Sequence, residues 1–153
     1  MGFETLEEIL EFAIEKEKEA VIFYMDLARQ APYAGARETL EEFSREERKH
    51  QVMLENLGKE KENLDEYKFE QIPDLKRSDY MVDVEYEKSM VYPDLLRLAM
   101  KREEIALKLY NESIKIAEKE ELKKIFQMLS QEEAKHKLKL ETLYDDYMAE
   151  QGD

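Results

Sequence analysis

Apolar side chains recur every three or four residues along four stretches of the chain, which is the spacing of one face of an α-helix. The first stretch opens at Thr5, which forms a capping box with Glu8, and it stops near Pro32. The second stretch weakens near Gly58, and the third begins at Pro93, a favoured residue of a first helical turn. The pattern predicts four long helices, whose apolar stripes cover residues 6–28, 40–57, 96–117 and 122–147.

The segment between the second and third stretches, residues 59–92, lacks this periodicity. It is charged, rich in tyrosine and broken by Pro73, and we interpret it as a long connection with some helical content. A helix of ~22 residues is ~33 Å long at ~1.5 Å per residue. The segment can span that distance even when partly coiled, so the helices before and after it can run in the same direction.

The two halves of the chain form an internal repeat without gaps. Adding 86 to a position in the first half gives its counterpart in the second half, so that Tyr24 corresponds to Tyr110. The pentapeptide EERKH, residues 46–50, corresponds in the same way to EEAKH, residues 132–136. These two pentapeptides contain the only histidines of the sequence. The repeat therefore predicts two copies of one helical hairpin.

Length and composition agree with a single helical domain. The 153 residues are enough to bury a core, and a content of only four Gly and three Pro favours long helices over sheet. We predict an all-α four-helix bundle formed by one domain, residues 1–153. In this bundle, hairpins at about residues 5–57 and 93–149 flank the crossover at residues 59–92.

Charge and cysteine content exclude several classes of function. A net charge of −14 argues against nucleic acid or an anionic membrane as a partner. No apolar run approaches the ~20 residues that span a bilayer, and the acidic N-terminus does not resemble a signal peptide. The absence of cysteine excludes disulfides, a thiolate nucleophile and cysteine-bound metals. A cytoplasmic location is the default expectation.

Ionisable residues interrupt the middle of every predicted apolar stripe. The Glu and His of each pentapeptide lie three residues apart, which places them on one face of a helix. The interruptions also lie at matching distances from the predicted hairpin turns, so we expect them to meet at one level inside the bundle. The set consists of Glu17, Glu47, His50, Glu103, Glu133 and His136.

This buried set needs compensation, because an unpaired charge in a protein interior is strongly unfavourable. Two divalent cations would balance the four carboxylates, and neutral imidazoles would complete the coordination. A set of carboxylates and imidazoles without thiolates suits iron or manganese, with zinc as a further candidate. A single Glu-x-x-His on a charged helix means little, and the alternative is a helical bundle with an empty or degenerate site.

Two tyrosines and one further glutamate lie near the predicted set. Tyr24 and Tyr110 follow Glu17 and Glu103 by two turns on the same helical faces. Core tyrosines need hydroxyl partners, and two interpretations are open: a hydrogen bond to a ligand carboxylate, or simple core packing. Glu104 neighbours Glu103 but points off the stripe, so we leave it out of the set.

The stretches EKEKEAVIFY and EEFSREERKH in the first half, and MKREEIALKLY and MLSQEEAKH in the second, carry the predicted set. They resemble the rubrerythrin branch of the ferritin-like proteins, over about residues 5–57 and 93–149. The resemblance implies a ferritin-like four-helix bundle that holds two iron ions. It implies that Glu17 and Glu103 are terminal carboxylate ligands and that Glu47 and Glu133 are bridging carboxylates. It implies that His50 and His136 are the histidine end ligands.

Two features depart from the rubrerythrin pattern. Rubrerythrins usually carry a rubredoxin-like domain with four cysteines, whereas this sequence has none, so the resemblance implies a separate electron-donor protein. They also place an extra Glu one turn after the ligand of the third helix, where this chain has Ala106. Three function hypotheses follow: an oxidoreductase that reacts with hydrogen peroxide or dioxygen, an iron-binding or storage protein without sustained turnover, and a metal-free structural bundle. The hairpins would pair within one chain or be exchanged in a homodimer.

Overall fold

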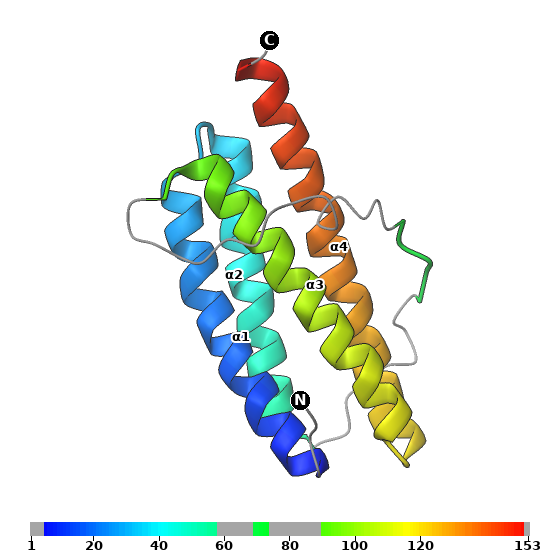
Figure 1. Cartoon of the computed structure of the whole chain (residues 1–153). Helices are drawn as coiled ribbons and strands as arrows, with labels where there is room; N and C mark the ends of the chain where they lie inside the picture. The colour runs from blue at the N-terminus through cyan, green and yellow to red at the C-terminus, as the bar shows by residue number, and fades with distance from the viewer. Residues whose placement is uncertain (1–4, 58–68, 74–89, 152–153) are drawn as a thin grey trace.

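Four α-helices make up the regular structure of the chain in a computed structural model, which describes residues 5–57, 69–73 and 90–151 (Figure 1). The helices are α1 (Leu6–Arg29), α2 (Ala34–Glu55), α3 (Tyr92–Ile116) and α4 (Glu120–Gln151). No strand occurs within these described ranges. None of the described helices combines the length and apolar character that crossing a membrane requires.

Local sequence signals explain where the helices begin and end. The Thr5 hydroxyl accepts a hydrogen bond from the backbone N–H of Glu8 at 3.1 Å, which caps the first turn of α1 as predicted. Helix α1 ends at Arg29, shortly before Pro32, and α3 has Pro93 in its first turn. The short connections after α1 and after α3 make each successive pair of helices an antiparallel hairpin.

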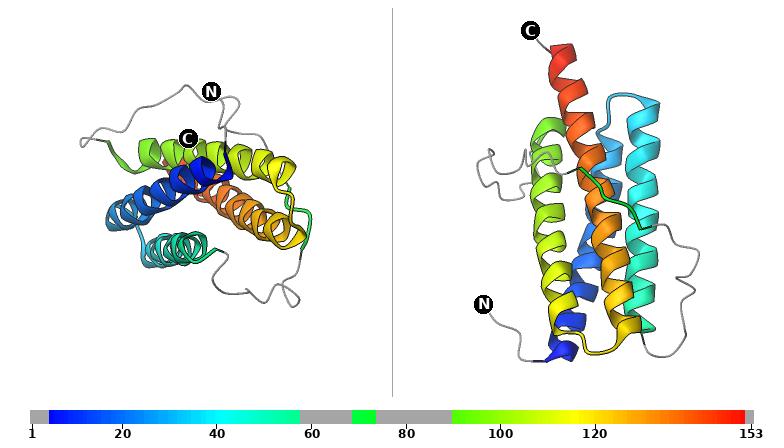
Figure 2. Two further views of the ribbon diagram at one scale, coloured as in Figure 1. Left: turned by 90° about the horizontal axis from the view of Figure 1, so that it is seen from below. Right: turned by 90° about the vertical axis from the view of Figure 1, so that its right-hand side faces the viewer.

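The two hairpins lie side by side, with α1 packed on α3 and α2 on α4 (Figure 1 and Figure 2). Helices α2 and α3 run in the same direction, as the long connection between them allows (Figure 1). This arrangement confirms the prediction of an all-α four-helix bundle. Of the predicted crossover, residues 69–73 form no helix and lie against the outside of the α3–α4 hairpin. Residues 90–91 also form no helix, and Tyr92, placed in the predicted crossover, is already the first residue of α3. Residues 59–68 and 74–89 of the predicted crossover lie outside the described residues.

Apolar side chains fill the bundle at both ends. The first apolar cluster, near the α1–α2 turn, includes Phe23, Tyr24, Leu27, Leu40, Phe43, Leu96 and Leu140. The second apolar cluster, at the opposite end, includes Ile9, Ala13, Leu54, Leu109, Tyr110, Phe126 and Leu129. Burial of such side chains stabilises the fold by about 1.5–3 kcal/mol each. The two clusters surround a polar layer at mid-height of the bundle, and this layer is the candidate site.

Candidate metal centre

Six ionisable side chains from all four helices converge in the polar layer between the two apolar clusters. Each of them is only 1–3% exposed to solvent. Helices α1 and α3 contribute one Glu each, and α2 and α4 contribute a Glu and a His three residues apart. The six are Glu17, Glu47, His50, Glu103, Glu133 and His136, so the structure brings together every residue of the set named from the sequence.

The six side chains fall into two groups of four that share two carboxylates. The first group, called site A, contains Glu17, Glu47, His50 and Glu133, and the second, called site B, contains Glu47, Glu103, Glu133 and His136. Within each group the candidate ligand atoms all lie within 4.8 Å of one another. The shared members are Glu47 and Glu133, so the arrangement consists of two adjacent sites joined by two carboxylates.

The distances place both imidazoles against these carboxylates through their Nδ1 atoms. His50 Nδ1 lies 3.1 Å from the Glu47 carboxylate and 3.6 Å from each of the Glu17 and Glu133 carboxylates. His136 Nδ1 lies 3.4 Å from the Glu133 carboxylate and 3.5 Å from the Glu47 carboxylate. It lies 3.7 Å from the Glu103 carboxylate of α3. These distances place the histidine Nδ1 atom and the carboxylate oxygens of each site around a common centre.

Each of the six side chains also directs one buried atom to this layer that has no hydrogen-bond partner among the described residues. These atoms are Glu17 Oε2, Glu47 Oε1, His50 Nδ1, Glu103 Oε2, Glu133 Oε1 and His136 Nδ1. Buried polar atoms in native proteins are almost always satisfied, so six orphaned atoms in one place indicate a missing partner. All six atoms can donate an electron pair, so the cluster fits a metal cation, which is a partner that could satisfy all of them together.

Burial shifts the proton equilibria of the cluster. It raises the pKa of the Glu47 and Glu133 carboxyls well above the usual range, and neighbouring carboxylates raise the pKa further. Burial also raises the pKa of Glu103 to about 7. Burial alone would lower the pKa of His50, but the adjacent Glu17 carboxylate outweighs it and raises that pKa to about 9. The metal-free cluster therefore retains protons at neutral pH, and a metal ion must displace them.

Two buried tyrosines hold the outer carboxylates by reciprocal hydrogen bonds between α1 and α3. The Tyr24 hydroxyl of α1 donates to Glu103 Oε1 of α3 at 2.8 Å, and the Tyr110 hydroxyl of α3 donates to Glu17 Oε1 of α1 at 2.6 Å. Burial, with the nearby carboxylates, raises the pKa of both phenols well above the usual value, so they remain donors. Of the two interpretations open from the sequence, the hydrogen bond to a carboxylate of the set is therefore the one observed. Each hydroxyl leaves the second carboxylate oxygen directed at the cluster.

Comparison with known proteins places this geometry in a family. The family model described as rubrerythrin matches residues 8–144, which is most of the chain. The chain belongs to the rubrerythrin family. A search of curated proteins found no match for this rubrerythrin-family protein. Among solved structures it is similar to a hypothetical protein from Pyrococcus furiosus, with 29% identity, a TM-score of 0.69, and coverage of 93% of this chain and 89% of that one.

Residue Glu46 joins the site although the sequence reasoning did not select it. Glu46 Oε2 lies 3.1 Å from Nε2 of His136, on the side of the ring opposite to the cluster. Burial alone would raise the pKa of Glu46, but the hydrogen bond with His136 outweighs it, and the pKa is lowered. Its position directly before Glu47 in the EERKH pentapeptide was the available signal. Glu104, left out of the set, contacts Lys137 instead and belongs to neither site of this rubrerythrin-family protein.

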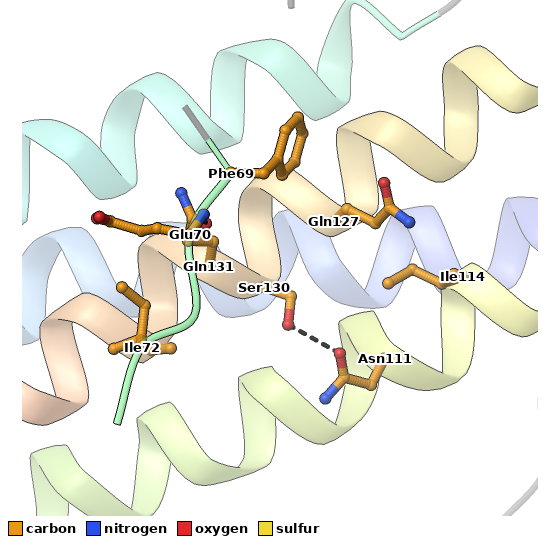
Figure 3. Close-up of a pocket in the computed structure, with 9 residues that line it drawn as sticks. Phe69, Glu70, Ile72, Asn111, Ile114, Gln127, Ser130 and Gln131 are labelled. Carbon is orange, nitrogen blue, oxygen red and sulfur yellow. Dashed lines mark hydrogen bonds between the residues drawn. The ribbon is translucent and has the colours of Figure 1, made fainter. Parts of the chain in front are cut away.

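A separate hollow lies on the outside of the α3–α4 hairpin, next to residues 69–73 (Figure 3). Ser130 Oγ, which lines it, donates a hydrogen bond to Asn111 Oδ1 at 2.8 Å (Figure 3). The backbone N–H of Glu70 donates to the side-chain oxygen of Gln131. Its lining includes none of the six clustered residues. This open hollow is therefore distinct from the candidate metal centre.

Proposed function

We propose that this rubrerythrin-family protein is a di-iron carboxylate oxidoreductase that reacts with hydrogen peroxide or dioxygen. The observation that carries the proposal is the convergence of six orphaned donor atoms in a buried layer. Membership of the rubrerythrin family and the absence of thiolates from the donor set support iron over zinc. Manganese satisfies the same donor preferences and is the alternative metal.

The residues would divide the work between two ions. Glu17 and His50 would bind the ion of site A, and Glu103 and His136 would bind the ion of site B. Glu47 and Glu133 belong to both groups and would bridge the ions. Two divalent cations would neutralise the four carboxylates, which offsets the burial and the mutual repulsion that otherwise keep protons on the cluster.

The chain's own residues would prepare the site for redox chemistry. Two ferrous ions, when bound, would supply the two electrons that convert hydrogen peroxide and two protons to two water molecules, or dioxygen and two protons to hydrogen peroxide. The Tyr24 and Tyr110 hydroxyls orient the outer carboxylates, and the apolar clusters on either side keep bulk water out. Protein ligands from only four residues at each site leave room for an oxidant.

A single-turnover experiment tests the oxidoreductase proposal. Protein reconstituted anaerobically with two equivalents of ferrous iron is mixed with hydrogen peroxide or with dioxygen in a stopped-flow instrument. We expect ferric absorbance to form once and then stop, because the sequence has no cysteine to hold a rubredoxin-type electron-transfer iron. Addition of a reductase and rubredoxin, or of a chemical reductant, is expected to restore cycling. Loaded protein in which ferrous iron survives both oxidants would contradict the proposal.

A second candidate function, ferrous iron binding without sustained turnover, is favoured by one position of the chain. Ala106, which packs at the second apolar cluster, occupies the place where the rubrerythrin pattern has an extra Glu. Loss of that carboxylate would remove a ligand that responds to the redox state of the iron. Storage of the ferritin type needs a large protein shell, so light scattering that finds a monomer or a homodimer in solution would contradict storage.

A further inference from the structure

A carboxylate outside the six-residue set contacts one of the two histidines at the ring nitrogen that faces away from the cluster. Glu46 Oε2, on α2, lies 3.1 Å from His136 Nε2, on α4, and the histidine side chain is only 2% exposed. The other ring nitrogen, Nδ1, faces the cluster and has no hydrogen-bond partner in the described parts of the chain. The imidazole of His136 is therefore placed between an outer carboxylate and the candidate metal centre.

This placement selects one tautomer of the ring. A neutral imidazole carries one N–H group, and its other nitrogen accepts or binds a metal. A carboxylate next to Nε2 favours the proton on Nε2, because an ionised carboxylate can only accept a hydrogen bond. The lone pair of His136 is then on Nδ1, which is the atom directed at site B.

The orientation of the ring is fixed by a second residue from the same helix. The Phe43 ring stacks on the His136 ring, with centroids 4.0 Å apart and an interplanar angle of 24°. Phe43 precedes Glu46 by three residues, so both side chains reach His136 from one face of α2. The repeat counterpart of Phe43 is Leu129, which has no ring to stack on His50. The surroundings of the two histidines therefore differ, although their carboxylate partners repeat.

We propose that Glu46 is a positioning residue for site B: its carboxylate holds the Nε2 proton of His136 and so presents Nδ1 to the metal. This inference rests on the proposed function, because it assigns a role toward the ion of site B. Residues that hold a ligating histidine in this way typically contribute about 10–100-fold to metal affinity. Loss of the Glu46 carboxylate should weaken binding of one ion and leave the ion of site A largely unaffected.

The experiment compares the full chain with Glu46→Ala, Glu46→Gln and the control Glu42→Ala. Glu42 lies one turn earlier on α2, is 47% exposed and pairs with Arg45, so its loss removes a similar charge away from His136. The binding of Co²⁺ is measured by its visible absorbance in competition with a chelator. We expect Glu46→Ala to bind one of two ions at least about tenfold more weakly. Glu46→Gln, whose amide oxygen can still accept from Nε2, should recover most of the loss, and Glu42→Ala should match the parent.

A metal-independent measurement tests the same idea. Nitrogen-15 spectra of the two histidine rings report which nitrogen carries the proton in the metal-free protein. The parent should show His136 protonated at Nε2, Glu46→Ala should shift the equilibrium toward Nδ1, and Glu46→Gln should resemble the parent. Because the Glu46 side chain is 27% exposed, we expect its replacement to preserve the fold, which circular dichroism checks.

The outcomes separate this inference from the proposed function. A parent that binds two ions, with equal affinities and an unchanged tautomer in Glu46→Ala, would overturn the positioning role and leave the metal centre intact. A parent that binds no metal would refute the proposed function. The nitrogen-15 spectra would then decide alone. An Nε2-protonated His136 that is lost in Glu46→Ala and kept in Glu46→Gln would support the positioning role. An unchanged His136 tautomer in both variants would overturn it.

Discussion

The free energy of unfolding should fall with rising pH in the metal-free protein and rise with pH in the metal-loaded protein. Burial raises the pKa of Glu103 to about 7, and, against the opposing effect of burial, the adjacent Glu17 carboxylate raises the pKa of His50 to about 9. A group whose pKa is higher in the folded state than in the unfolded state binds more protons when folded. Its contribution to stability is complete below the unfolded pKa and is lost as the pH rises through the folded pKa.

The size of the effect follows from these two groups. The pKa of Glu103 rises from 4.5 to about 7, which corresponds to about 3 kcal/mol at ~1.36 kcal/mol per pKa unit. His50, whose pKa rises from 6.5 to about 9, contributes a similar amount in a higher pH window. The groups interact, so the two amounts are not additive. We expect the metal-free protein to lose about 3 kcal/mol of unfolding free energy between pH 5 and 8.

Binding of metal should reverse this trend. The ligands must lose their protons to bind, so metal affinity rises with pH. A ligand at a thousandfold excess over its dissociation constant stabilises the folded state by ~4.1 kcal/mol, which exceeds the ~3 kcal/mol that the metal-free protein loses. The stabilisation caused by ferrous iron or manganese should therefore be small at pH 5 and large at pH 8.

Thermal unfolding followed by circular dichroism, with chelator or with metal, measures both trends. A loss of ~3 kcal/mol corresponds to a fall in Tm of roughly 6–12 °C for a chain of this size. The variant Glu103→Gln removes one titrating group and should flatten the metal-free curve between pH 5 and 7, whereas the more exposed Glu104→Gln should not. A metal-free Tm that stays level or rises from pH 5 to 8 would refute the pKa reasoning.

Three further predictions concern the ligands and their partners. Elemental analysis of protein reconstituted anaerobically should find about two iron ions per chain, and a result of none would contradict the metal centre. Glu103→Ala should bind metal with lower stoichiometry or affinity, and Glu104→Ala should match the parent in the same titration; equal effects would show that the α3 assignment is wrong. Tyr110→Phe leaves Glu17 Oε1 without its 2.6 Å donor and should cost about 1–3 kcal/mol in urea unfolding of the metal-free protein. The less buried Tyr144→Phe is the control, and an equal cost in both variants would contradict the role of the hydrogen bond.

Local helical geometry made the fold and the polar layer predictable from the sequence. The i, i+3 and i, i+4 spacing determines which side chains share a face without knowledge of any partner helix. The same rule located Glu17 and Glu103 inside apolar stripes and placed His50 and His136 beside their glutamates. The internal repeat, whose two copies are offset by 86 positions, then indicated that both hairpins place these groups at one level.

Contacts between helices were decided by the tertiary structure alone. The sequence placed Tyr24 on the same face as Glu17, yet its hydroxyl donates a hydrogen bond to Glu103 on the neighbouring helix. In the same way, the Tyr110 hydroxyl donates to Glu17 and not to Glu103 of its own helix. The choice depends on how far one helix slides and turns against the other, which the packing of many side chains determines together. The contact from Glu46 to His136 has the same origin, because Glu46 lies beside the inward stripe of α2 and meets the imidazole only where α4 packs against it.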